Sequence, residues 1–236
     1  MLDSLTSSEK RELADLLEEL ERRKSRRLFY RTYPEDGPLC RANYPKHMMM
    51  FALGAKHLER AFIAGNRTGK TFSGSYEATC HTTGLYPDWW TGKRFDTATS
   101  GWCAGKTAET ARDIIQVALI GEDPDSPGTG MIPGDLIVDC KFRPNTNKSL
   151  DYVMVRHSSG GVSRIGLKSY DQRRKAFEGT ARHWIWLDEE PPADIYSECL
   201  IRTATLNGIV VCTFTPLEGA TDVVRRFLEE AEETHV

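Results

Sequence analysis

The chain has 236 residues, with 31 Lys and Arg against 34 Asp and Glu, and so carries a formal net charge of -3. This balance excludes a strongly basic nucleic-acid-binding arm and an acidic tail, and a composition of 39% hydrophobic and 28% charged residues excludes a disordered or collagen-like chain. No apolar run approaches the ~20 residues of a membrane helix, so we expect no membrane span. The first ten residues contain no apolar signal segment, and the six cysteines form no Cys-x-x-Cys pair. We therefore expect a cytosolic α/β domain with reduced thiols.

The first predicted element is a helix over about residues 7–28. Thr6 and Glu9 form a capping box, and leucines 13, 16, 17 and 20 recur at helical spacing. Acidic residues lead this segment and basic residues follow, as the helix dipole favours. Either the leucine stripe docks the helix on the protein, or its basic end contacts DNA or another subunit. Residues 33–45 contain Pro and Gly and indicate a linker. We therefore expect residues 1–60 to form an N-terminal helical arm or lid ahead of a main domain over 61–236.

From residue 61 onward, short apolar runs alternate with helical segments, which is the pattern of βα units around a mostly parallel sheet. We predict strands near 61–65, 98–104, 136–142, 150–157, 162–168, 183–188 and 208–214, and helices near 69–82, 106–120, 194–206 and 221–233. Residues 158–161, Ser-Ser-Gly-Gly, separate two of these strands and predict an antiparallel hairpin within the parallel fold.

The first of these strands runs directly into a phosphate-binding loop. The sequence from 61 to 71 reads AFIAGNRTGKT, with Ala64 where the pattern G-x-x-x-x-G-K-[ST] has its first glycine and Gly65 one place on. In such a loop the backbone N–H groups and the start of the following helix cradle phosphate, the lysine reaches the β and γ oxygens, and the hydroxyl ligates Mg²⁺. We therefore expect a nucleoside triphosphate to bind Gly65, Asn66, Arg67, Thr68, Gly69, Lys70 and Thr71.

Arg67 places a guanidinium inside this loop. It could stabilise charge on the γ-phosphate in the transition state, as arginine fingers do, or it could form a salt bridge that stiffens the loop. An arginine of a neighbouring subunit could do the same work, and the eligible residues are Arg112, Arg143, Arg173, Arg174, Arg182 and Arg202.

Charge is unevenly distributed along the second half of the chain. Residues 141–182 contain ten Lys and Arg and three acids, whereas residues 183–236 contain three Lys and Arg and eleven acids. The basic segment could follow the phosphates of a nucleic acid. Alternatively it is a solvated surface that the acidic segment balances, and charge alone leaves both interpretations open.

The predicted strand 183–188 ends in carboxylates. Its sequence continues as Asp188-Glu189-Glu190, and the carboxyl end of a buried strand is where open α/β sheets bind ligands. Asp188 would hold Mg²⁺ through water, Glu189 would orient or deprotonate the attacking water, and Glu190 is the less suitable base. Together with the phosphate loop, these acids predict hydrolysis rather than nucleotide binding alone.

The last predicted strand ends in Thr213-Phe214-Thr215. Hydroxyls at a strand end beside the γ-phosphate can sense its loss and couple hydrolysis to movement. Threonine is also a common strand residue, so this interpretation depends on the other two motifs.

The segments AGNRTGKT, WIWLDEEPP and TFTPLEG together resemble the ATPase domain of the terminase large subunit of tailed bacteriophages, over about residues 40–220. The resemblance implies an α/β P-loop NTPase fold of the ASCE type, a mostly parallel sheet flanked by helices. It implies that Lys70 and Thr71 of the Walker A loop contact phosphate and Mg²⁺, with Asp188 as the Walker B acid, Glu189 as the catalytic base, and Thr213 and Thr215 as the coupling motif. The segment 44–51 is similar to that family's adenine-contacting segment, with His47 or Tyr44 in place of the usual Gln.

The resemblance also implies a function: an ATP- and Mg²⁺-dependent motor that drives double-stranded DNA into a procapsid. It implies the portal protein and a small terminase subunit as partners, and a homo-oligomeric ring at the portal vertex in the host cytoplasm. We expect the isolated domain to be a monomer. The family's C-terminal nuclease, with an RNase H-like fold, has no counterpart in these 236 residues, so we expect no nuclease activity. The alternatives are a helicase-like nucleic-acid-dependent ATPase and a nucleotide-binding regulatory subunit without turnover.

Overall fold

The computed structural model describes residues 6, 11, 13–16, 18–19 and 27–234, with side chains up to residue 228. Most of the helix expected over residues 7–28, including Glu9 of its capping box, lies outside the described residues. None of the described helices is both long and apolar enough to cross a membrane.

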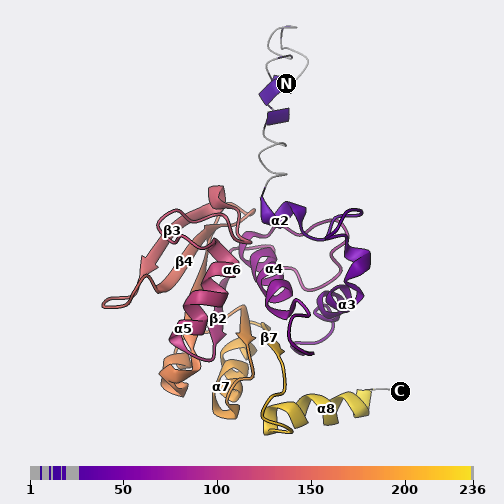
Figure 1. Cartoon of the computed structure of the whole chain (residues 1–236), viewed down its shortest axis with the longest axis vertical. Helices are drawn as coiled ribbons and strands as arrows, with labels where there is room; N and C mark the ends of the chain where they lie inside the picture. The colour runs from indigo at the N-terminus through magenta and orange to yellow at the C-terminus, as the bar shows by residue number, and fades with distance from the viewer. Residues whose placement is uncertain (1–5, 7–10, 12, 17, 20–26, 235–236) are drawn as a thin grey trace.

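A seven-stranded mixed sheet forms the centre of the described structure (Figure 1). Its strands are β1 (Glu59–Ile63), β2 (Ser100–Gly105), β3 (Ile137–Phe142), β4 (Leu150–Arg156), β5 (Val162–Ser169), β6 (Trp184–Asp188) and β7 (Ile209–Phe214), in the order β1-β7-β6-β2-β5-β4-β3. Strands β1, β7, β6, β2 and β5 are parallel, whereas β4 is antiparallel to both β5 and β3. The predicted strands and the β4–β5 hairpin are confirmed, with ends that differ by one or two residues.

Helices cover both faces of this sheet. They are α2 (Leu28–Arg31), α3 (Pro45–Leu53), α4 (Lys70–Thr83), α5 (Ala108–Thr110), α6 (Val117–Ile120), α7 (Ala193–Ala204) and α8 (Asp222–Thr234). The helix predicted over 106–120 is present from 108, but its middle, Ala111–Gln116, is a π-helical segment between α5 and α6. Helices α4 and α6 pack on one face and α7 on the other (Figure 1).

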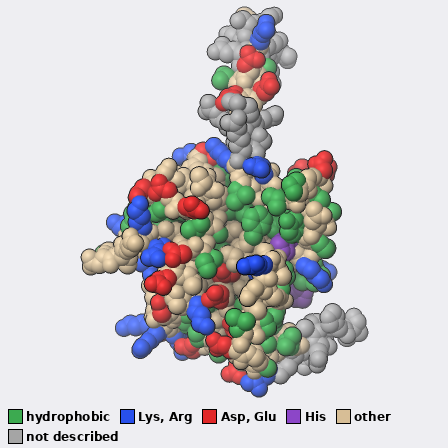
Figure 2. Space-filling view, viewed as in Figure 1, with side chains coloured by type: hydrophobic (Ala, Val, Ile, Leu, Met, Phe, Trp, Pro, Cys, Tyr) green, Lys and Arg blue, Asp and Glu red, His purple; other side chains and the backbone are tan. Residues whose placement is uncertain are grey.

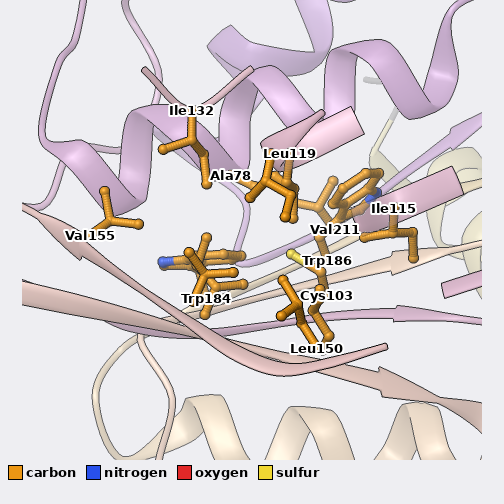
Figure 3. Packing of buried hydrophobic residues seen from close by; sticks show 14 of the residues in the cluster. Ala78, Cys103, Ile115, Leu119, Ile132, Leu150, Val155, Trp184, Trp186 and Val211 are labelled. Atoms are coloured by element: carbon orange, nitrogen blue, oxygen red, sulfur yellow. The ribbon is translucent and has the colours of Figure 1, made fainter. Parts of the chain in front are cut away.

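Two hydrophobic clusters separate the helices from the sheet. Trp184 and Trp186 of β6 point toward α4, whereas Ile185 and Leu187, which alternate with them, point toward α7. Figure 3 shows the first cluster, in which both tryptophans pack with residues of α4 and α6. A strand that is buried on both faces is apolar at every position, which explains the uninterrupted run that made β6 recognisable in the sequence.

The segment 33–45, for which Pro and Gly content predicts a linker, is mostly exposed but begins with a residue that is buried in the protein. Tyr33 is 1% exposed and packs edge-on against Phe51 of α3 and Tyr76 of α4. Aromatic side chains bury a large apolar area, and these residues belong to a third hydrophobic cluster, which joins α2 and α3 to α4. On the face seen in Figure 2, hydrophobic side chains gather over this region. The stretch from Phe29 to Phe51 is therefore packed into the same body as the sheet.

Candidate nucleotide-binding site

The phosphate loop joins β1 to α4. Gly69 precedes the first helical residue, Lys70, with φ of 80°, a conformation that glycine adopts without strain. A Cβ atom on Gly69 would also lie 2.9 Å from the ring of His47. Lys70 Nζ donates to the carbonyl oxygen of Gly65 at 2.6 Å, so its ammonium lies folded over the loop. This is the geometry of an anion-binding helix N-terminus with a lysine beside it.

Asp188 at the end of β6 lies next to the start of α4. The Thr71 hydroxyl donates to the Asp188 carboxylate, with Oγ1 3.0 Å from Oδ2, and the Thr213 hydroxyl donates to Oδ1 at 2.6 Å. Trp186 Nε1 in turn donates to Thr213 Oγ1 at 2.7 Å. Burial raises the pKa of Asp188 to about 6, although the hydrogen bonds from Thr213 and Thr71 act in the opposite direction. A bound cation beside this carboxylate would favour its ionised form.

The oxygen atoms of Thr71 and Asp188 suit Mg²⁺. This ion prefers oxygen ligands and is usually held by one or two protein groups together with water and substrate phosphates. The described residues contain no group of three or more His, Cys, Asp and Glu side chains that could hold a metal ion by itself. The donor set therefore fits a cation that shares its coordination with a nucleotide.

Glu189 and Glu190 have different surroundings. Glu189 has φ of 65°, and its N–H donates to the Thr213 carbonyl oxygen at 2.9 Å. The Tyr170 hydroxyl donates to the carbonyl oxygens of Asp188 and Glu189, which holds this turn in place. Both side chains line the same cavity. The Glu190 carboxylate accepts a hydrogen bond from the Thr221 hydroxyl, whereas the Glu189 carboxylate has no hydrogen-bond partner among the described residues.

Thr215 connects the end of β7 to the phosphate loop. Its hydroxyl lies 2.9 Å from the carbonyl oxygen of Ala64 and 3.0 Å from Asn66 Oδ1. Because Thr213 contacts Asp188, the two threonines of one strand end contact both the acid and the loop. Neighbouring parallel strands explain this arrangement: β7 lies between β1 and β6.

These residues surround a cavity of about 480 Å³. Its lining includes most of the predicted loop and both strand ends: Asn66, Arg67, Gly69, Lys70, Thr71, Asp188, Glu189, Thr213 and Thr215. Lys106, which the sequence reasoning missed, also lines it and pairs with Glu218, with Nζ 3.1 Å from Oε1. Its position directly after β2, another parallel strand of the sheet, was the available signal.

A second cavity of about 580 Å³ adjoins the first and shares Arg67, Gly69 and Phe72 with it. Tyr44 and Thr68 line it, and so does His47, although that side chain is only 3% exposed.

Both ring nitrogens of His47 are engaged within the protein. Nε2 lies 3.0 Å from the Thr68 carbonyl oxygen, which can only accept, so Nε2 carries the proton. Nδ1 therefore accepts from the Tyr33 hydroxyl at 2.6 Å. Burial lowers the pKa of His47 and favours this neutral form. In this arrangement His47 supports the phosphate loop, and Tyr44 presents the more accessible ring to the cavity.

The arginines considered for catalysis lie in different places. Arg67 is exposed at the junction of the two cavities. Neither cavity is lined by any of the six others. Arg112 pairs with Asp113, Arg143 with Asp151, both Arg174 and Arg202 with Glu198, and Arg182 donates to Thr180. The side chain of Arg173 is exposed and has no partner among the described residues.

Comparisons with known proteins show which family this chain resembles. The chain is 36% identical over 248 residues to the large terminase subunit of Salmonella phage P22. The aligned region covers 97% of this chain and 48% of the P22 protein, so the chain spans about half the length of this relative. The structure of the large terminase of a thermophilic bacteriophage, in complex with ADP, matches with a TM-score of 0.55 at 12% identity, over 80% of this chain and 42% of that one, which supports the P-loop NTPase fold. The ATPase domain of the large terminase of Thermus phage P74-26 matches with a TM-score of 0.47 at 16% identity, over 73% of this chain and 64% of that one. Residues 61–236 match the family described as "Terminase large subunit, T4likevirus-type, N-terminal". The chain therefore belongs to the terminase large subunit family.

Proposed function

We propose that this domain binds and hydrolyses ATP. The observation that carries the proposal is the convergence of Lys70, Thr71, Asp188 and Glu189, from two segments far apart in the sequence, on one cavity at the carboxyl ends of the parallel strands. Family membership supports the same activity. The adjoining cavity beside Tyr44 has room for the nucleoside.

Each residue has a distinct task in this proposal. The loop N–H groups and Lys70 hold the phosphates, for which the ammonium must exchange the Gly65 carbonyl oxygen for phosphate oxygens. Thr71 and Asp188 would hold Mg²⁺, which neutralises charge on the β- and γ-phosphates. Glu189, whose carboxylate is not engaged by another described residue, would polarise the attacking water. Arg67 lies where its guanidinium can stabilise the γ-phosphate in the transition state.

Hydrolysis would drive translocation of double-stranded DNA into a procapsid. When the γ-phosphate leaves, the contacts of Thr213 with Asp188 and of Thr215 with the phosphate loop can relay the change along β7. As the family resemblance implies, the motor would act as a ring at the portal vertex in the host cytoplasm, together with the portal protein and the small terminase subunit. Arg173, which is exposed and has no partner among the described residues, is our candidate for an arginine that would reach a neighbouring subunit.

Two substitutions test the hydrolytic core. Lys70→Ala should weaken ATP binding and remove turnover, and Glu189→Gln should keep ATP affinity but lower kcat by roughly 10²- to 10⁴-fold, because it removes the general base. Phosphate release and binding of a fluorescent ATP analogue measure the two effects. Glu190→Gln is the matched control and should stay near wild type, since Glu190 bonds to Thr221.

Normal turnover in Lys70→Ala or Glu189→Gln would rule out this catalytic assignment. ATP binding by the wild type with no hydrolysis, even with DNA and assembled partners present, would support a regulatory nucleotide-binding subunit instead. Metal-dependent DNA cleavage by the pure domain would contradict the expectation that it has no nuclease activity.

A further inference from the structure

A third, basic pocket lies on the face of the sheet that carries α7. Trp102 of β2 belongs to the cluster beneath α7, and Arg164 and Lys168 of β5 alternate with Ile165 and Leu167, which face the opposite cluster. The pocket encloses about 320 Å³ and shares no lining residue with the two cavities at the phosphate loop. We call it the Trp102 pocket; its charged lining residues are Asp151, Arg164, Lys168 and Arg182.

Aromatic rings hold the cations of this pocket in place. Lys168 Nζ lies 4.7 Å and Arg182 Cζ 4.4 Å from the centre of the Trp102 ring, and Arg164 Cζ lies 4.0 Å from that of Tyr152. Trp102 extends over the neighbouring strand, since a Cβ on Gly166 would lie 2.9 Å from its ring. Cation–π contacts restrict long side chains, so less conformational entropy is lost when these groups bind a ligand.

The positive charge of the pocket is only partly neutralised. Asp151 is its single acidic lining residue, and its nearest cation is Arg143, with Nε 3.9 Å from Oδ1. Burial, together with the nearby charges of Arg182 and Arg143, lowers the pKa of Lys168. Burial and the charge of Arg164 lower the pKa of Arg182. An anion between these groups would relieve their mutual repulsion.

The basic residues of segment 141–182 differ in whether an acidic side chain neutralises them. Lys148 pairs with Asp125 and Arg174 with Glu198, as in an ordinary balanced surface. Arg164 has no acidic partner among the described residues, and Arg182 donates only to Thr180 and a backbone carbonyl oxygen. Arginine presents a planar fork of donors that matches phosphate, so these two residues are the ones positioned for an anionic ligand.

We propose that the Trp102 pocket binds a phosphate group of the backbone of double-stranded DNA, an assignment that rests on the proposed motor function. Arg164 and Arg182 would donate to the phosphate oxygens, and Lys168, whose Nζ donates to the Ala176 carbonyl oxygen at 2.5 Å, would add positive charge. Contacts of this kind carry no base sequence information, as a motor that moves along any DNA requires. A free phosphate ion presents the same oxygen atoms and is the alternative ligand for this pocket.

Binding of a short, labelled duplex of mixed sequence to the full chain, measured by fluorescence anisotropy over a series of salt concentrations, tests the proposal. Arg164→Gln and Arg182→Gln should each weaken binding roughly threefold to tenfold and reduce the slope of log K against log salt by about one, because each removes one phosphate contact. Arg182→Lys should keep part of the affinity. Lys56→Gln is the matched control and should change neither the affinity nor the salt slope. Lys56 is exposed and lines neither the two cavities at the phosphate loop nor the Trp102 pocket.

Thermal melting and ATP affinity, measured on the same samples, show whether each variant is folded. Unchanged duplex affinity and salt slope in folded Arg164→Gln and Arg182→Gln would overturn the proposal, and so would an equal loss in Lys56→Gln or a wild type that binds no duplex. Binding of inorganic phosphate that is lost in Arg182→Gln, while duplex binding persists, would assign the pocket to a free anion and also overturn it. Basal ATP turnover, measured without DNA, tests the proposed function separately from the pocket. If turnover is absent but the pocket variants still lose DNA affinity, the proposed ATP hydrolysis fails and the pocket assignment stands. If turnover is present but the pocket variants keep their DNA affinity, the pocket assignment fails and the proposed hydrolysis stands.

Discussion

His81 is a buried histidine held in its neutral form by its neighbours. Its Nε2 lies 3.2 Å from Glu77 Oε1 and donates to that carboxylate, and its Nδ1 accepts from the Tyr86 hydroxyl at 3.0 Å. Burial lowers the pKa of His81 despite the neighbouring carboxylate. The lowered pKa means that the unfolded chain binds a proton at a higher pH than the folded chain does. The stability contributed by neutral His81 is therefore present above pH ~6.5 and is lost as the pH falls further.

We expect the free energy of unfolding to fall on acidification below pH ~6.5, by at most about 1.4 kcal/mol per pH unit for this one proton. His81→Gln should make this dependence shallower, even if it lowers stability at pH 7. Urea unfolding at several pH values between neutral and mildly acidic measures the slope. His57→Gln, at an exposed position after α3, is the matched control. A wild-type slope in His81→Gln would contradict the assignment.

Helix α4 approaches the sheet closely because of one small residue. A Cβ on Gly74 would lie only 2.3 Å from the ring of Trp186, the side chain whose Nε1 bonds to Thr213. Glycine in the middle of a helix costs about 1 kcal/mol relative to alanine, but here a side chain cannot be accommodated without moving the indole. The close packing of α4 on β6 thus also keeps Thr71 near Asp188.

Gly74→Ala should therefore destabilise the protein, by about 1–3 kcal/mol, although alanine is the better helix former. Thermal or urea unfolding measures the change, and Gly74→Ala with Trp186→Phe should recover part of it, because the smaller ring leaves more room. An increase in stability in the single variant would show that helix propensity outweighs the close contact.

At the scale of the whole molecule, Arg60 joins helix α3, in the N-terminal part of the chain, to β1 and α4 of the sheet domain. This β1 residue donates to the Met50 carbonyl oxygen of α3 at 2.6 Å and pairs with Glu77 of α4, with Nη2 2.6 Å from Oε1. Both side chains of the pair are 3% exposed. Removing one partner of a buried ion pair leaves an uncompensated charge in the interior, which is strongly destabilising.

Arg60→Met should lower the free energy of unfolding by about 3–5 kcal/mol. Arg60→Met with Glu77→Gln should be less destabilised than the sum of its single variants, because the double variant leaves no buried carboxylate at this position. A double-mutant cycle in urea measures this coupling. An additive result would mean that Arg60 and Glu77 do not stabilise each other.

The features that could be predicted from the sequence are those that neighbouring residues specify. The strands β6 and β7 are continuous apolar runs, and Gly-Lys-Thr marks the start of α4, so their positions follow from neighbouring residues alone. The π-helical segment Ala111–Gln116 and the burial of Tyr33 were not predictable in this way. Both depend on contacts with residues distant in the sequence, and such contacts override local preference.

By itself, the sequence determined the phosphate loop, the acids after β6, the threonines at the end of β7 and the family to which the chain belongs, because each is a short pattern of neighbouring residues. The tertiary structure decided what these residues contact. The strand order puts β7 between β1 and β6, which brings Thr213 to Asp188 and Thr215 to the loop. Burial directs His47 toward the Thr68 carbonyl oxygen, and the pairing of β2 with both β5 and β6 brings Lys168 and Arg182 to Trp102. Packing and strand pairing act between distant residues, so only the folded chain reveals these contacts.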